Sequence, residues 1–233
     1  MGWGDLVLLK DASFEVERGT VFAILGGSGC GKSTLMRYLV GLDPPVAGTV
    51  LVDGLSPELE AGRPRFGVMF QSGALFGSMT VGENVALALE EWTALPHDAI
   101  ASIVSSKLRL VGLEGATETF PSELSGGMKK RAAIARAMAL EPELLFLDEP
   151  SAGLDPVSAV ELDHLIAELS AAFGLTVVIV THELPSIFAI AKTCIVLDKV
   201  SMSIIARGDP RELRDRSEDP RVHGFFNRES KGG

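Results

Sequence analysis

A glycine-rich stretch near the start of the sequence has the residue types and spacing needed to hold phosphate. Residues 26–33 read Gly-Gly-Ser-Gly-Cys-Gly-Lys-Ser and match the pattern G-x-x-x-x-G-K-[ST]. The glycines let the backbone turn tightly and aim amide N–H groups at a triphosphate. Lys32 would reach the β- and γ-phosphates, and the hydroxyl of Ser33 would bind Mg²⁺. The alternative, a flexible glycine-rich turn, does not require this order of residues between a strand and a helix. We therefore predict a nucleotide-binding loop made by Gly26, Gly27, Ser28, Gly29, Cys30, Gly31, Lys32, Ser33 and Thr34.

Two adjacent carboxylates follow an apolar run later in the sequence. Residues 144–147 are apolar throughout, and Asp148 and Glu149 come directly after them. A buried strand would deliver Asp148 to Mg²⁺ at its carboxyl end, where α/β sheets place their ligands. Glu149 would then be the general base that polarises the attacking water. Alone, such a pair is more often an ordinary strand end with solvated acids, but its combination with the phosphate loop favours the catalytic interpretation.

A serine and two glycines precede a predicted helix over residues 129–140. Ser125 is a good N-cap residue, and Gly126 and Gly127 leave the first helical amides bare. A capped helix alone explains the serine, whereas two glycines are a poor helix start. An anion approaching the backbone at this N-terminus would explain them. The basic triplet at residues 129–131 is interpreted as a solvated helix face, in preference to a phosphate contact.

These residues need a scaffold, and the hydrophobic pattern predicts one. Short apolar runs predict strands over residues 20–25, 49–52, 67–70, 144–147, 176–180 and 193–197. Apolar residues at helical spacing predict helices within residues 100–111 and 162–173. This alternation predicts an α/β fold with a mainly parallel sheet. The phosphate loop at residues 26–33 then makes this fold a P-loop NTPase core.

The remaining segments differ from this core. Residues from about 81 to 139 show no strand pattern, which predicts a helical subdomain inserted between two parts of the sheet. Residues 6–16 and 46–52 are candidates for an antiparallel β subdomain, and residues from about 209 to 233 form a charged C-terminal tail. Neither an internal repeat nor a low-complexity linker is present, so we expect one domain over residues 1–233.

Composition excludes several classes of protein. A chain of 233 residues with 46% hydrophobic and 22% charged residues is globular rather than disordered or collagen-like. Its net charge of −10 argues against nucleic acid as a partner. The longest apolar runs, such as Val21–Leu25, are far shorter than the ~20 residues that a membrane span needs. Two cysteines, Cys30 and Cys194, make no disulfide framework, which favours a reducing cytoplasm.

Together, these motifs resemble the nucleotide-binding domain of ABC ATPases over essentially the whole chain. In that family Leu124–Gly127 corresponds to the signature motif and Gln71 to the glutamine of the Q-loop. Residues 151–155 resemble the D-loop, which ends in Asp155, and His182 resembles the switch histidine. The order and spacing of the motifs also fit the family.

The resemblance implies roles for these residues. Gln71 and His182 would act in catalysis beside Glu149, and Gln71 would join Ser33 and Asp148 as a ligand of Mg²⁺. The signature residues Ser125, Gly126 and Gly127, together with Asp155, would contact ATP. Trp3 stands where family members place the aromatic side chain that stacks on adenine.

The resemblance also implies partners. In the family, the signature motif of one subunit closes on ATP held by the phosphate loop of a second copy, so that a head-to-tail homodimer encloses two ATP molecules. A nucleotide-binding domain without a membrane span suggests a separate subunit that drives integral membrane permease subunits from the cytoplasmic face of the inner membrane. The less favoured alternative, a soluble ABC ATPase of DNA repair or translation, needs a long coiled coil or tandem domains, and this chain has neither.

Two stretches narrow the transporter class. Residues 70–76, Phe-Gln-Ser-Gly-Ala-Leu-Phe, and residues 121–128, Pro-Ser-Glu-Leu-Ser-Gly-Gly-Met, resemble the ATPase of Mce-type lipid transporters. Residues 219–226 in the tail are similar to that group too. The resemblance implies a phospholipid transporter of the kind that maintains outer-membrane lipid asymmetry. An importer of amino acids or osmolytes is the alternative.

Overall fold

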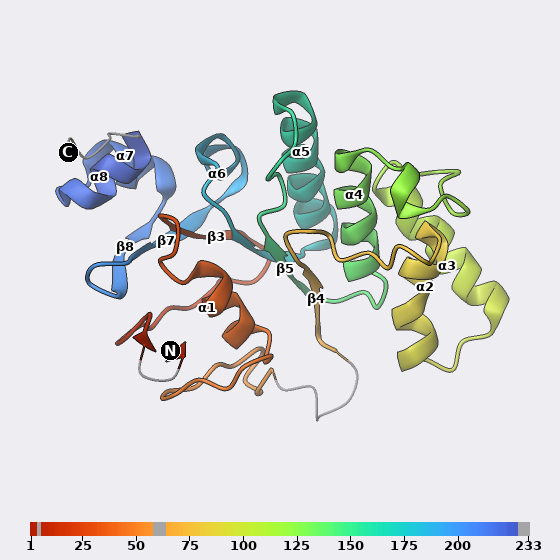
Figure 1. Cartoon of the computed structure of the whole chain (residues 1–233), viewed down its shortest axis with the longest axis horizontal. Helices are drawn as coiled ribbons and strands as arrows, with labels where there is room; N and C mark the ends of the chain where they lie inside the picture. Colours follow the sequence, from red (N-terminus) through yellow and green to blue (C-terminus); the bar gives the residue numbers. More distant parts are fainter. Residues whose placement is uncertain (4–5, 58–63, 228–233) are drawn as a thin grey trace.

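A six-stranded sheet forms the centre of the computed structural model, which describes residues 1–3, 6–57 and 64–227 (Figure 1). The strand order is β4-β5-β6-β3-β7-β8; the first five strands are parallel, and β8 runs antiparallel to β7. The bounds are β3 Val21–Gly26, β4 Phe66–Met69, β5 Leu144–Asp148, β6 Thr176–Val180, β7 Thr193–Asp198 and β8 Ser203–Gly208. The predicted α/β class with a mainly parallel sheet is confirmed.

The apolar runs form strands because both faces of the sheet are covered. Along β3, Phe22 and Ile24 join one buried cluster, whereas Ala23 and Leu25 join another, as the alternation of side chains across a strand requires. Helix α1 (Lys32–Leu39) packs into the first cluster. Helices α5 (Pro156–Phe173) and α6 (Leu184–Ile190) lie on the opposite side of the sheet (Figure 1).

The predicted helical subdomain is present at one end of the molecule. It contains α2 (Val81–Trp92), α3 (His97–Leu110), the short helix η2 (Pro121–Glu123) and α4 (Gly126–Ala137), and no strand interrupts residues 81–139. These helices lie beyond β4, on the right in Figure 1. A capping box fixes the start of α2: the hydroxyl of Thr80 accepts from the amide of Glu83, and the Glu83 carboxylate accepts from the amide of Thr80.

The expected antiparallel strands are shorter than the sequence indicated. In residues 6–16, only Leu6–Val7 forms a strand, β2, which pairs with β1 (Gly2–Trp3). The strand predicted over residues 49–52 is wrong, because Val52 forms a single bridge with Leu55. The intervening turn at Asp53 and Gly54, with φ of 53° and 77°, folds the chain back at once.

The described part of the tail, residues 209–227, contains two helices, which the sequence pattern did not reveal. Helices α7 (Pro210–Arg216) and α8 (Pro220–Asn227) follow β8. Val222 and Phe226 of α8 are buried in the cluster that includes Ala23 and Leu25. Helix α8 therefore packs against the core, and the tail is not simply a charged surface segment.

Candidate functional site

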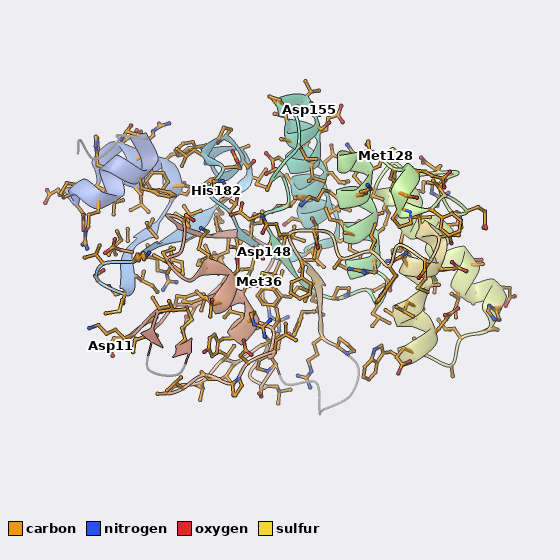
Figure 2. The ribbon with its side chains drawn as sticks, in the orientation of Figure 1. Asp11, Met36, Met128, Asp148, Asp155 and His182 are labelled. Carbon is orange, nitrogen blue, oxygen red and sulfur yellow. The ribbon has the colours of Figure 1, made fainter. Side chains whose placement is uncertain are left out.

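Three neighbouring strands bring the phosphate loop, Asp148, Glu149 and His182 to one edge of the sheet. Strands β5, β6 and β3 are adjacent and parallel, so their carboxyl ends meet. The phosphate loop leaves β3, Asp148 ends β5, and Thr181 and His182 follow β6. This edge is the ligand-binding edge of α/β folds. Asp148 and His182 lie near the middle of the molecule in Figure 2.

The phosphate loop has the backbone shape that its glycines permit. Gly31 caps α1 with φ of 97°, a left-handed conformation that favours glycine. A Cβ on Gly26 would lie only 2.7 Å from the carbonyl oxygen of Leu197 on β7. The ammonium of Lys32 donates to the carbonyls of Gly26 at 2.9 Å and Gly27 at 3.4 Å. The loop thus already folds around its own lysine, while residues 27–29 at its tip are exposed.

Asp148 lies against the phosphate loop. Its Oδ1 accepts from the hydroxyl of Ser33 at 3.5 Å, and the residue is only 7% exposed. Burial and the nearby charge of Glu149 raise its pKa, while the Ser33 hydrogen bond, Lys32 and Lys130 act in the opposite direction. A hydroxyl and a carboxylate are hard oxygen donors, the type that Mg²⁺ binds through one or two protein ligands. The donor set therefore fits that cation, whose charge would offset the cost of burying the carboxylate.

Glu149 is held from several directions. Its Oε1 lies 2.7 Å from Nδ1 of His182, and its Oε2 accepts from the hydroxyl of Thr181 at 3.2 Å. Its backbone has φ of 47°, an uncommon conformation for a residue other than glycine. The Glu149 amide donates to the carbonyl of Val180 at 2.7 Å. The carboxylate is thus oriented by two side chains that follow β6, and sequence reasoning had not included Thr181.

Lys130 does not lie on a solvated helix face, and that interpretation of the basic triplet is wrong for this residue. The residue is 8% exposed, and its ammonium donates to the carbonyl of Gln71 and, at 3.1 Å, to that of Glu149. Burial lowers its pKa, and the charges of Asp148 and Glu149 raise it. Helical spacing could have indicated the burial of Lys130 from the sequence, because Lys130 precedes Ile134, which is fully buried, by four residues and so lies on the same helix face.

The Ser-Gly-Gly stretch begins α4 as predicted, although the helix ends at Ala137 rather than 140. The hydroxyl of Ser125 accepts from the amide of Met128 at 3.2 Å. Asp155 caps α5 in the same way, accepting from the amides of Val157 at 3.1 Å and Ser158 at 3.0 Å. The side chain of Ser158 and then these amides lower the pKa of Asp155. Both caps are exposed. In Figure 2, Met128 and Asp155 lie apart from Asp148 and His182.

Comparisons with known proteins connect this geometry to a family. A family model described as "ABC transporter" matches residues 9–152. The intermembrane phospholipid transport system ATP-binding protein MlaF of Escherichia coli (strain K12) is 43% identical over 229 residues, which cover 96% of this chain and 84% of that protein. The chain belongs to the ABC transporter family. It is an ATPase, an enzyme that binds and hydrolyses ATP.

Other similar proteins agree with this membership. MlaF of Haemophilus influenzae is 41% identical, with 98% of this chain and 88% of that protein covered. A probable ribonucleotide transport ATP-binding protein, mkl of Mycobacterium leprae, is 41% identical over 97% of this chain and 66% of that protein. Among solved structures, the dimeric post-hydrolysis state of the ATP-binding cassette MJ0796, bound to ADP and Pi, has a TM-score of 0.79 and 28% identity, covering 90% of this chain and 94% of that one.

Among the described side chains, the remaining residues noted in the sequence of this ABC ATPase contribute none to the Asp148–Glu149–His182 cluster. Gln71 is exposed and meets the cluster through its backbone carbonyl. The side chain of Trp3 falls outside the described residues. Cys30 is 2% exposed and Cys194 is fully buried, and burial raises the pKa of both thiols, that of Cys194 to about 12. Across the described ranges, no helix is both long and apolar enough to cross a membrane.

Residues 70–77, the segment that contains Gln71, present the rings of Phe70 and Phe76 to solvent. Phe76 is 51% exposed, whereas Leu75 packs against the core of the helical subdomain. Asn84, which is fully buried, fixes this segment: its Oδ1 accepts from the amide of Phe76 at 2.7 Å, and its Nδ2 donates to the Phe76 carbonyl at 3.1 Å. The exposed ring of Phe76 is therefore attached to a backbone that Asn84 of α2 holds in place. Sequence reasoning had not included Asn84.

Proposed function

We propose that this chain is the ATPase subunit of an Mce-type phospholipid transporter and that its 233 residues act as a single domain. Integral membrane permease subunits would hold it at the cytoplasmic face of the inner membrane. The observation that carries the enzymatic part is the contact of Glu149 with His182 and Thr181 beside the Ser33–Asp148 pair. The cargo rests on the similarity to MlaF, whose name gives phospholipid transport, at up to 43% identity.

The phosphate loop would hold the triphosphate of ATP. The exposed residues Gly27, Ser28 and Gly29 supply amides, and Lys32 would exchange its contacts with loop carbonyls for phosphate oxygens. Ser33, Asp148 and the side chain of Gln71 would hold Mg²⁺. When bound, this cation would neutralise charge on the β- and γ-phosphates.

Glu149 would take the proton from the attacking water. Its carboxylate is buried and already fixed by Thr181, so little reorganisation precedes the proton transfer. His182, whose side chain is 56% exposed, would contact the γ-phosphate from the same side. A general base placed in this way contributes about 10²–10⁴ to the rate.

A second copy of the chain would complete each site. Ser125, Gly126, Gly127 and Asp155 are exposed or partly exposed at helix N-termini. In Figure 2, Met128 in the first turn of α4 and Asp155 lie apart from Asp148, whose carboxylate contacts Ser33 of the phosphate loop. In a head-to-tail dimer the four exposed residues would face ATP held by the partner, where helix N-termini favour a negative charge. The dimeric arrangement of the MJ0796 cassette supports this assignment.

Cargo is tested with the chain assembled on its permease. ATP turnover of the complex is measured in phospholipid bilayers, then in detergent, and then with ribonucleotides or amino acids added as competing cargoes. We expect phospholipid to stimulate turnover and the other two classes to leave it unchanged. Stimulation by ribonucleotides, the cargo in the name of mkl, would replace the lipid assignment and leave the ATPase assignment intact.

A further inference from the structure

The ammonium of Lys130 links two loops that are 78 residues apart in sequence, from Gln71 to Glu149. It lies at the second turn of α4 and donates to the backbone carbonyls of both residues. One carbonyl belongs to the segment that leads to Phe76, and the other belongs to the proposed general base. Helix α4 therefore supports both loops.

Burying this ammonium is costly, so its position calls for an explanation. A lysine loses hydration on burial and is almost never fully buried without partners. Here two carbonyls accept its hydrogen bonds, and the carboxylates of Asp148 and Glu149 supply opposite charge. The same helix makes a second contact with the 70–77 segment, because Arg136 donates to the carbonyls of Gly73 at 2.9 Å and Ala74 at 2.6 Å. Helix α4 thus holds consecutive parts of one loop.

Glu149 needs such a support. A non-glycine residue at φ of 47° persists only when its surroundings over-determine its conformation. The amide of Glu149 is held by Val180, and its carbonyl is held by Lys130 and by the amide of Ala152 at 3.2 Å. Removing the Lys130 contact would free one side of this residue and loosen the direction of its carboxylate.

We propose that Lys130 is a positioning residue: it clamps the backbones of Gln71 and Glu149 together and so sets the carboxylate of Glu149 for proton transfer. This inference rests on the proposed role of Glu149 as the base. Movement of the 70–77 segment would then reach Glu149 through one side chain. Lys130 itself contacts neither the substrate nor the reacting water.

Three substitutions test the clamp. Lys130→Met keeps the length of the side chain without a donor, and Lys130→Gln keeps a donor without the charge. Lys107→Met is the matched control, because Lys107 is also 8% exposed but pairs with Glu141, at 3.1 Å, outside the site. We expect Lys130→Met to lower kcat about 10- to 100-fold with KM within about threefold, Lys130→Gln to fall between it and wild type, and Lys107→Met to keep kcat.

Each variant is also examined for ATP affinity and thermal unfolding, so that a folding defect is separated from a kinetic one. If Lys130→Met does not fold, Lys130→Gln decides the question. A wild-type kcat in a folded Lys130 variant overturns the clamp. Equal losses of kcat in Lys130→Met and Lys130→Gln also overturn the clamp, because they would show that the missing charge, and not the missing hydrogen-bond donor, causes the loss.

A double-mutant cycle with Glu149→Gln gives the sharpest readout. A residue that acts by positioning a base loses its effect when the base is removed. We therefore expect Lys130→Met to slow single-turnover hydrolysis in wild type but by less than about twofold in the Glu149→Gln background. An equal slowing in both backgrounds overturns the inference. If Glu149→Gln alone hydrolyses ATP at the wild-type rate, the proposed base fails, which is a result distinct from failure of the clamp.

Discussion

The substitution Glu149→Gln isolates proton transfer because the structure lets glutamine keep the contacts of glutamate. Oε2 accepts from the Thr181 hydroxyl at 3.2 Å, a bond that the amide oxygen can accept equally well. The amide NH₂ can then donate to Nδ1 of His182, which lies 2.7 Å from Oε1. Folding and ATP binding should therefore persist, whereas the amide cannot take a proton from water.

The expected loss follows from that single missing function. General-base catalysis is worth about 10²–10⁴ in rate, or about 2.7–5.4 kcal/mol at 1.36 kcal/mol for each factor of ten. We expect kcat to fall by this factor, KM to change less than about threefold, and ATP to hold the dimer closed for longer. The assay is phosphate release under single-turnover and steady-state conditions, with dimer content measured by light scattering.

Glu183→Gln is the matched control. Oε1 of Glu183 lies 3.6 Å from Nε2 of His182. The substitution therefore removes a carboxylate beside the same imidazole ring and leaves the Ser33–Asp148 pair unchanged. We expect its kcat to stay within about threefold of wild type. Turnover of Glu149→Gln within that same range would refute the base assignment. A large loss of kcat in Glu183→Gln, with Glu149→Gln active, would instead assign the role of general base to Glu183.

Three further predictions concern other parts of the chain. Burial and the raised pKa of Cys30 predict that maleimide labels this thiol at least about 100-fold more slowly in the folded protein than in guanidinium, as mass spectrometry would show. Phe76→Asp should weaken permease pull-down about 30-fold and leave ATP binding and Tm unchanged, whereas Leu75→Asp should lower Tm because its side chain packs against the core. Asp163, with an unpartnered Oδ1 and a pKa raised by burial, should make Asp163→Asn more stable than wild type to urea at pH 7. The pKa of Asp163 is raised in the folded protein, so the advantage of Asp163→Asn should shrink as the pH falls through that pKa toward the unfolded value of about 3.9. A difference in unfolding free energy that stays constant with pH would contradict the reasoning.

Local rules in the sequence were enough for much of the site. The glycine-rich loop and the acids after β5 follow fixed spacings, and parallel strands bring their carboxyl ends together without further information. The apolar residues at helical spacing in residues 100–111 and 162–173 correctly predicted α3 and α5, because this spacing gives a helix one apolar face to bury. His182 was placed by the resemblance to the family's switch histidine, and its contact with Glu149 was not predicted from the sequence.

What sequence reasoning missed depends on tertiary contacts. Lys130 belongs to a run of three basic residues, and although helical spacing puts it on the same face as Ile134, its ammonium finds its two carbonyl partners through the docking of α4 against two loops. Asn84 looks like an ordinary polar residue of a helix until Phe76 is brought against it. The strand expected over residues 49–52 failed because a tight turn at Asp53 left Val52 with one bridging partner. Helix α8 is short, and its burial depends on packing over β3 and β7.

The most direct test of the proposed function is ATP-driven phospholipid transfer by the chain assembled with its permease in vesicles. Fluorescent phospholipid is followed from donor to acceptor membranes, with wild type and Glu149→Gln compared in parallel with and without MgATP. The account predicts transfer that requires ATP with wild type and falls at least about 100-fold with Glu149→Gln. Transfer that is equally fast in Glu149→Gln, or no ATP-dependent transfer by a wild-type complex that hydrolyses ATP, would contradict it.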